Sequence, residues 1–99
     1  MTLLTTKETD MKNVIEDTEI AVNEGLESLM NQDITLFCMN YIYTGKLVGI
    51  NDTQVKLDGA KIVYETGSFS EKEWSDAQSL PNGTWYVRLA TVESYGILK

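Results

Sequence analysis

Few residues of this chain could do chemistry of their own. The sequence has no histidine and a single cysteine, so the usual general base, the commonest zinc ligand and the histidine-dependent nucleophiles are all missing. Paired acids could do acid–base or magnesium chemistry, but Glu71 and Glu73 would diverge on a helix, and Glu16 and Glu19 would share a solvated face. Cys38 alternates with apolar residues in the sequence. This pattern is typical of a buried thiol that packs like a small apolar side chain. We therefore expect a protein that is not an enzyme and that holds no metal and no cofactor.

Aromatic and basic side chains carry the binding chemistry that remains. An aromatic ring can stack on a flat base, and a lysine or arginine beside it can hold a phosphate. Most of the aromatic residues should fill the core or an interface between subunits. For a nucleotide-sized ligand in a pocket between subunits, the candidate residues are Tyr43, Lys46, Tyr64, Trp74, Trp85 and Arg88.

Negative charge is concentrated in the first third of the chain. Residues 1–33 hold eight acids and two lysines, a sum of −6, whereas residues 34–99 hold seven acids and six bases, a sum of −1. The total of −7 argues against direct nucleic-acid binding, which needs clustered lysine and arginine. The acidic side chains Glu16, Glu19 and Glu27 form either a solvated face or a functional surface, which would bind a basic partner or mimic DNA.

The first third also has the pattern of an amphipathic helix, expected over roughly residues 6–31. Thr5 and Glu8 have the spacing of a capping box, in which both side chains satisfy backbone amides at the start of a helix. Gly25 would bend this helix or end it early. The apolar stripe consists of Met11, Ile15, Val22, Leu26 and Leu29.

Short strands are expected from residue 34 onward. ITLFCMNYIYTG is rich in β-branched and aromatic residues and ends at a turn signal, Thr44–Gly45. KLVGI, TQVKLDG and AKIVYETG follow, separated by short Asn, Asp or Gly turns, the first at Asn51–Asp52. A short helix near residues 70–80 interrupts the strands, because Ser70 and Glu73 have capping-box spacing. TWYVRLATVESYGIL then closes the chain as one strand or a bent pair.

These elements predict one domain of the α+β class. The acidic helix, residues 1–33, packs on or swaps across a small five-stranded antiparallel barrel, residues 34–99, that carries the helix near 70–80 as an insertion. An amphipathic helix and strands with two apolar faces offer more apolar surface than one small barrel covers, so a homo-oligomer is expected. The sequence contains no membrane-spanning apolar run and no signal-peptide pattern, so we expect no membrane contact and a cytoplasmic location.

Two family resemblances add to this reading. The segment YTGKLVGINDTQVKLDGAKIV resembles the first signature of the Sm-like family, whose bent, SH3-like barrel of five strands assembles into rings. The aromatic and the asparagine that hold a base in that family have no counterparts here, where Thr53 and Gln54 stand. Residues 34–99 are also similar to small proteins of tailed phages and prophages. The positions that match the Sm-like signature are Gly45, Leu47, Asp52, Val55, Leu57 and Ala60.

The expected function is therefore non-catalytic binding. The phage resemblance implies an accessory factor that blocks host defence in the host-cell cytoplasm, by sequestering either a host protein or a small nucleotide signal. Two alternatives stay open: a structural or assembly component of a phage particle, and a divergent Sm-like RNA-binding protein.

Overall fold

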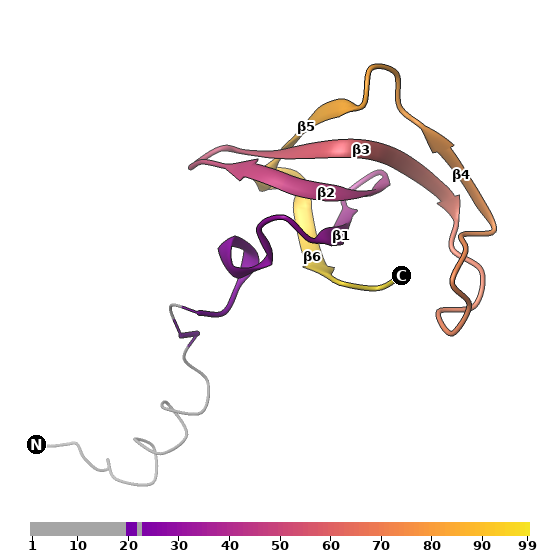
Figure 1. Cartoon of the computed structure of the whole chain (residues 1–99), viewed down its shortest axis with the longest axis horizontal. Helices are drawn as coiled ribbons and strands as arrows, with labels where there is room; N and C mark the ends of the chain where they lie inside the picture. The colour runs from indigo at the N-terminus through magenta and orange to yellow at the C-terminus, as the bar shows by residue number, and fades with distance from the viewer. Residues whose placement is uncertain (1–19, 22) are drawn as a thin grey trace, which may run out of the picture.

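Six antiparallel strands and two short 3₁₀ helices make up the described part of the chain. The computed structural model describes residues 20–21 and 23–99 (Figure 1). In chain order the elements are η1 (Leu26–Leu29), β1 (Asp33–Cys38), β2 (Ile42–Ile50), β3 (Gln54–Glu65), β4 (Asp76–Ser79), β5 (Thr84–Arg88), η2 (Leu89–Thr91) and β6 (Val92–Gly96).

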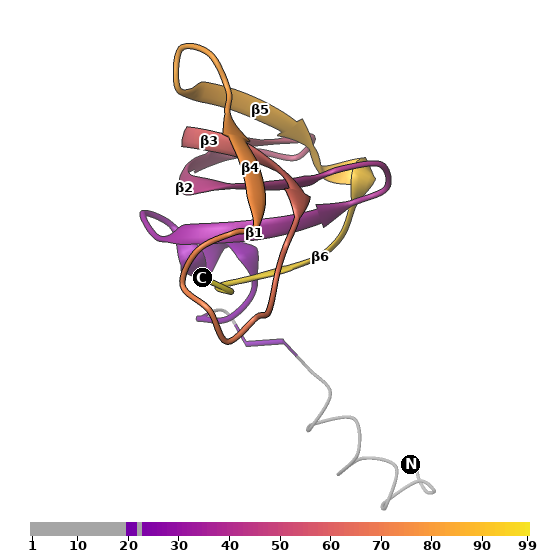
Figure 2. The same ribbon diagram turned by 90° about the vertical axis from the view of Figure 1, so that its right-hand side faces the viewer.

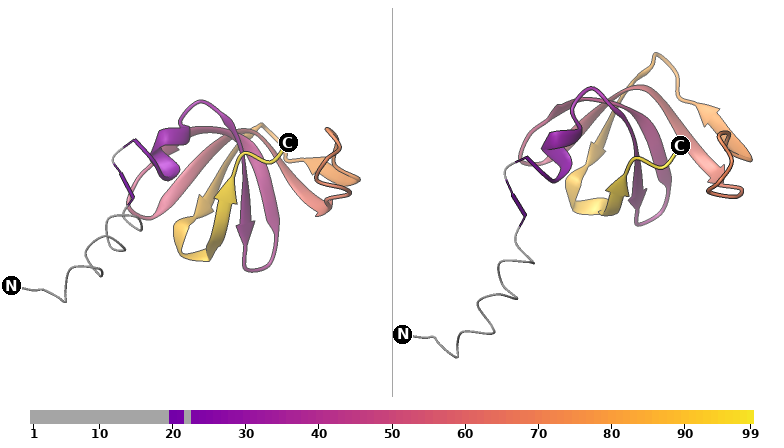
Figure 3. Two further views of the ribbon diagram at one scale, coloured as in Figure 1. Left: turned by 90° about the horizontal axis from the view of Figure 1, so that it is seen from below. Right: turned by 60° about the horizontal axis from the view of Figure 1, so that its bottom comes forward.

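All six strands belong to one bent sheet. Its order is β4-β3-β2-β1-β6, and β5 also pairs with β3. β3 is long enough for its first half, residues 54–58, to pair with β5 and its second half, residues 61–65, to pair with β4. Between the halves lies Gly59 with φ of 61°, a left-handed conformation that glycine adopts without steric cost, and the register with β2 shifts there. The sheet as a whole curls, as Figures 2 and 3 show.

One face of the curled sheet forms the core. Along β3, Val55 and Leu57 are buried while their neighbours in sequence are exposed, the alternation of a strand with one face toward a core. Leu26 and Leu29 of η1 pack against the same cluster. Each large aliphatic side chain removed from water stabilises the fold by about 1.5–3 kcal/mol. The core cluster consists of Ile34, Leu36, Leu47, Val55, Leu57, Ala60 and Val87.

The prediction of an α+β fold is wrong. The described part of the chain has no α-helix, and its two 3₁₀ helices have four and three residues. Most of the helix predicted over residues 6–31 lies outside the described residues, and in the described end of that stretch the helical element is η1. Gly25 precedes η1 with φ of 88°, and Asn31 follows with φ of 70°. Because an α-helix needs negative φ throughout, these two residues leave room for a single turn.

The prediction of a helix near residues 70–80 is also wrong. Residues 66–75 form a loop, and β4 follows it. Ala77 and Gln78 lie opposite Val63 and Ile62 of β3, so the sheet provides the backbone partners that a helix would otherwise have supplied. Ser70, expected to cap a helix, instead has its hydroxyl hydrogen-bonded to the hydroxyl of Ser68 at 2.8 Å.

The five-stranded arrangement is wrong in its strand count and in two of its turns. Gly45 lies inside β2 and Gly59 inside β3, each next to a register shift and not in a turn between strands. The turn at Asn51–Asp52 is confirmed, because it joins β2 to β3. The last segment forms two strands, β5 and β6, separated by η2, which is the bent pair that the sequence left open. With β4 in place of the predicted helix, the sheet has six strands and not five.

Candidate functional site

One face of the sheet gathers the basic side chains. Residues directly opposite each other in antiparallel strands point to the same face, and so do residues two apart in one strand. The exposed residues Lys46, Lys56, Lys61 and Arg88 each adjoin a buried core residue in sequence. The pairing of β3 with β2 and with β5 therefore puts all four on the face opposite the core, which we call the basic face. Asp33 and Asp58, which pair with Lys46, lie on this face as well.

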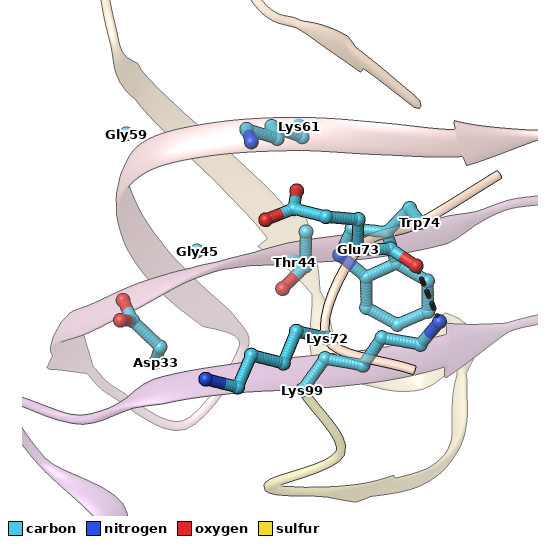
Figure 4. Close-up of a pocket in the computed structure, with 9 residues that line it drawn as sticks. All are labelled: Asp33, Thr44, Gly45, Gly59, Lys61, Lys72, Glu73, Trp74 and Lys99. Atoms are coloured by element: carbon cyan, nitrogen blue, oxygen red, sulfur yellow. Dashed lines mark hydrogen bonds between the residues drawn. The ribbon is translucent and has the colours of Figure 1, made fainter. Parts of the chain in front are cut away.

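A hollow of about 210 Å³ opens on the basic face where β2 and β3 meet the loop 66–75 (Figure 4). Two more lysines, Lys72 and Lys99, line it. The basic face thus has all six Lys and Arg residues of segment 34–99, since the chain has eight and the other two are Lys7 and Lys12. This lysine hollow is lined by Asp33, Thr44, Gly45, Gly59, Lys61, Lys72, Glu73, Trp74 and Lys99.

The β2 side of the lysine hollow is fixed by close packing. A Cβ atom on Gly45 would lie 3.1 Å from the carbonyl oxygen of Asp58 and 3.2 Å from the Cα of Ala60, so glycine lets β2 approach β3 closely. Beside it, the buried Thr44 hydroxyl donates a hydrogen bond of 2.8 Å to the carbonyl oxygen of Ile34. This bond ties β2 to β1 beneath the hollow.

Lys99 holds the loop side of the hollow. Its ammonium donates hydrogen bonds to the carbonyl oxygens of Thr66, Ser68 and Glu73, at 2.7, 3.0 and 2.8 Å. The same nitrogen lies 4.7 Å from the centre of the Trp74 ring, a cation–π distance. An ammonium has three N–H donors, and all three bind carbonyl oxygens of the loop. Lys99 therefore contributes its charge to the hollow but no free hydrogen-bond donor.

A second hollow of about 200 Å³ lies on the basic face near the β2–β3 turn. The Tyr86 ring is 56% exposed, and the Lys56 ammonium is 6.0 Å from its centre. Asn51 fixes the turn, because its Oδ1 accepts hydrogen bonds from the backbone amides of Thr53 and Gln54 at 2.9 and 2.8 Å. This tyrosine hollow is lined by Gly49, Ile50, Asn51, Gln54, Lys56 and Tyr86, with no carboxylate in its lining.

The size and charge of the hollows limit what they could bind. Pockets that enclose drug-sized ligands measure about 300–1,000 Å³, so each hollow fits one group, such as a phosphate or a single ring, better than a whole nucleotide. Lysine ammonium groups are suited to phosphate as point charges, and Lys61 and Lys72 offer two in the lysine hollow. The exposed ring of Tyr86 offers a stacking surface beside Lys56.

The six residues predicted for a nucleotide pocket do not come together within one chain. Trp74 lines the lysine hollow, and Lys46 and Arg88 lie on the basic face. Trp85 lies opposite the buried Leu57 and therefore points to the core side. Tyr64 is exposed near the end of β3.

Tyr43 belongs to the core side as well. It packs against the core cluster, and burial raises the pKa of its phenol, with Cys38 and the neighbouring tyrosines adding to the rise. Its ring meets that of Tyr41 edge to face at 6.2 Å between centres. The prediction that Tyr43 binds a ligand therefore gains no support from its position.

Sequence reasoning missed several residues of the two hollows. Lys56 and Tyr86 could have been found, because each is next to a buried valine or leucine in an alternating strand and therefore faces outward. Lys72 and Lys99 carry no such signal, because the loop and the chain end reach the hollow only through the tertiary fold.

The predicted acidic surface is only partly described. Glu16 and Glu19 lie outside the described residues. Glu27 is exposed in the first turn of η1, as a solvated side chain would be. The charge pattern of the first third thus stays a prediction for a partner-binding surface.

No catalytic group stands out among the described residues. Burial raises the pKa of the Cys38 thiol, which a weaker hydrogen-bond contribution from Thr91 opposes, so the reactive thiolate is disfavoured. No group of three or more acidic, cysteine or histidine side chains within residues 20–21 and 23–99 could hold a metal ion. Over the same residues, no helix has the length and apolar character needed to cross a membrane.

Comparison with known proteins gives no relatives. No protein-family model matches the chain, no curated protein matches it, and no solved structure matches it. The resemblances to Sm-like proteins and to phage proteins therefore stay predictions.

Proposed function

We propose that this protein is a non-catalytic binding protein that holds the phosphate group of a small ligand, such as a nucleotide, on the basic face. The observation that carries the proposal is the grouping of all six Lys and Arg residues of segment 34–99 on one face of a chain whose net charge is −7.

The charge close to the lysine hollow supports this proposal better than the net charge of the chain does. At physiological ionic strength, charges more than about 8 Å apart are largely screened, so a bound anion responds to the cations close to it. In the lysine hollow these are Lys61 and Lys72, with the charge of Lys99 behind them. Asp33 and Glu73 line the same hollow and would restrict where the anion can sit.

The two hollows would hold different parts of one ligand or of two. Lys61 and Lys72 suit a phosphate, and Tyr86 with Lys56 suits a flat ring next to a negative charge. Binding without catalysis accounts for a sequence without histidine and for a cysteine whose thiolate is disfavoured. Sequestration of a nucleotide signal in an infected host cell would use such a face, and that biological setting follows from the phage resemblance alone.

The test is calorimetric titration of the purified protein with inorganic phosphate, AMP, ATP and a cyclic dinucleotide. At least one phosphate compound should bind, more weakly as salt rises, and Lys61→Glu should weaken it at least about tenfold, as loss of a charged hydrogen bond does. The matched control is the double variant Lys61→Glu with Glu93→Lys, which restores the net charge of −7 through an exposed residue of β6.

The outcomes separate local from global electrostatics. If the double variant binds as weakly as Lys61→Glu alone, the lysine hollow is the site. If it regains the original affinity, only net charge matters and the proposed site is wrong. Absence of binding to every phosphate compound would reject the function itself.

A second candidate function is assembly, the structural role that the sequence left open. Within the described residues, β4 and β5 each pair only with β3, and β6 pairs only with β1. Each therefore has one edge with unpaired backbone groups, which can pair with another chain. Light scattering across a concentration series tests this candidate: a fixed oligomer would support it, and a monomer at all concentrations would reject it.

A further inference from the structure

The loop 66–75 surrounds an ammonium group with the chemistry of a binding site. Three of its carbonyl oxygens, from Thr66, Ser68 and Glu73, accept hydrogen bonds from one nitrogen, the Nζ of Lys99, at 2.7–3.0 Å. Trp74 of the same loop places its ring 4.7 Å from that nitrogen. Figure 4 shows the Lys99 ammonium beside the indole, with the bond to Glu73 dashed.

These four groups match a primary ammonium in number and type. A primary ammonium, in which the nitrogen is bonded to one carbon, has three N–H donors. The loop offers three acceptors, so every donor is satisfied. The aromatic face adds a cation–π attraction that a neutral amide or hydroxyl would not gain. A guanidinium presents five donors in a plane, and a quaternary ammonium presents none, so neither meets the same set of acceptors.

We call the three carbonyl oxygens and the Trp74 ring the ammonium cage. The segment that supplies this cage is remote in sequence from the lysine that fills it. Lys99 follows its three acceptors by 33, 31 and 26 residues. All the acceptors and the ring come from ten consecutive residues, so the loop presents the complete cage without contributing the ligand. Gly67 has φ of 70°, and a Cβ there would collide with the hydroxyl of Ser75, so the loop conformation depends on glycine.

We propose that the loop 66–75 is a binding site for a primary alkylammonium, the end group of a lysine side chain, and that Lys99 of the same chain occupies it. This proposal goes beyond the anion-binding function proposed above, because its ligand is a cation held by carbonyl oxygens, although Glu73, Trp74 and Lys99 also line the lysine hollow. A ligand tethered within its own chain acts at an effective concentration of about millimolar, so an external amine must compete with Lys99.

The experiment empties the cage and refills it from solution. In Lys99→Ala, n-propylammonium replaces the atoms that the substitution removes. We expect it to bind at millimolar concentration, to shift the Trp74 indole N–H signal in NMR spectra, and to raise the melting temperature of the variant. Trp85→Phe assigns the two indole signals.

Three controls define the site. The unsubstituted protein and Lys72→Ala should give no response at the same concentration, because Lys99 still fills the cage although Lys72 lines the same hollow. Tetramethylammonium should act much more weakly on Lys99→Ala, since it can contact the ring but cannot donate hydrogen bonds.

Two results would overturn the proposal. One is a folded Lys99→Ala protein that does not respond to n-propylammonium. The other is an equal response to tetramethylammonium, which would leave an aromatic contact without an ammonium cage. If Lys99→Ala does not fold without ligand, refolding is the response to be measured, and it is expected with n-propylammonium and not with tetramethylammonium.

Discussion

Replacing Gly45 by alanine tests the close approach of β2 and β3 beside the lysine hollow. The new Cβ would lie 3.1 Å from the carbonyl oxygen of Asp58, 3.2 Å from the Cα of Ala60 and 3.3 Å from the Cβ of Leu57. Two of these three atoms are backbone, and the third belongs to a fully buried side chain, so the strands themselves must move apart. Overpacking of this kind costs about 1–3 kcal/mol.

Part of that cost is offset in the unfolded chain. Alanine loses less conformational entropy on folding than glycine, which contributes about 0.4–1 kcal/mol where the native φ is compatible. From the midpoints of the two ranges, the net expectation for Gly45→Ala is a loss of about 1.3 kcal/mol, or about 5–10 °C in melting temperature for a domain of this size. Gly96→Ala is the matched control, because no atom lies within 4 Å of its Cβ position. It should gain about 0.4–1 kcal/mol through the same entropy term.

Thermal and urea unfolding of the two variants give the measurement. Replacement of glycine by alanine should lower the stability at position 45 and raise it at position 96. A general effect of alanine in strands would change the stability in the same direction at both positions. Equal stability changes for Gly45→Ala and Gly96→Ala would refute the close packing of β2 on β3. The phosphate titration should weaken in parallel for Gly45→Ala, since Lys61 follows Ala60 directly on the displaced strand.

Three further predictions concern the core, a buried hydrogen bond and the thiol. Leu57→Ala should cost about 2–5 kcal/mol in urea unfolding, because Leu57 is fully buried; a loss below about 1 kcal/mol would contradict the assigned core. Thr44→Val should cost about 1 kcal/mol and Thr44→Ser less, since serine keeps the hydroxyl that donates to Ile34; equal losses would contradict the bond. Burial raises the pKa of Cys38, so a disulfide reagent should react more slowly with folded than with unfolded protein. Folding favours the neutral thiol, so its contribution to stability is complete below about pH 8.5 and is lost as the pH rises through the pKa of the folded protein. The Cys38→Ala variant should not show this decrease in stability at high pH.

The strands from β1 to β3 could be anticipated because their residues alternate. Val55 and Leu57 are buried between exposed neighbours, and this period of two predicts a half-buried strand without knowledge of its partner. Gly45 and Gly59 misled the prediction, since glycine is equally suited to a turn and to a bulge inside a strand. Only the register of β2 against β3 distinguishes the two.

The segment after β3 could not be predicted from local pattern. β4 has the sequence DAQS, with one apolar residue, and it is a strand because it lies along the second half of β3. The loop before it contains the spacing of a capping box, yet its carbonyl groups are bound by Lys99 from the far end of the chain. Long-range contacts override weak local preferences here.

The candidate site shows why the net charge of the chain does not describe the charge of one face of the sheet. A sum over the chain ignores the period of two, which puts Lys56 on one face of β3 and the leucine beside it on the other. Repeated along β2, β3 and β5, this alternation separates the cations from the core. An anion near Lys61 responds mainly to the charges within one screening length of it, which include Lys72 and the carboxylates of Asp33 and Glu73 in the same hollow. The balance of cations and carboxylates close to Lys61, and not the net charge of the chain, therefore decides whether a phosphate binds there.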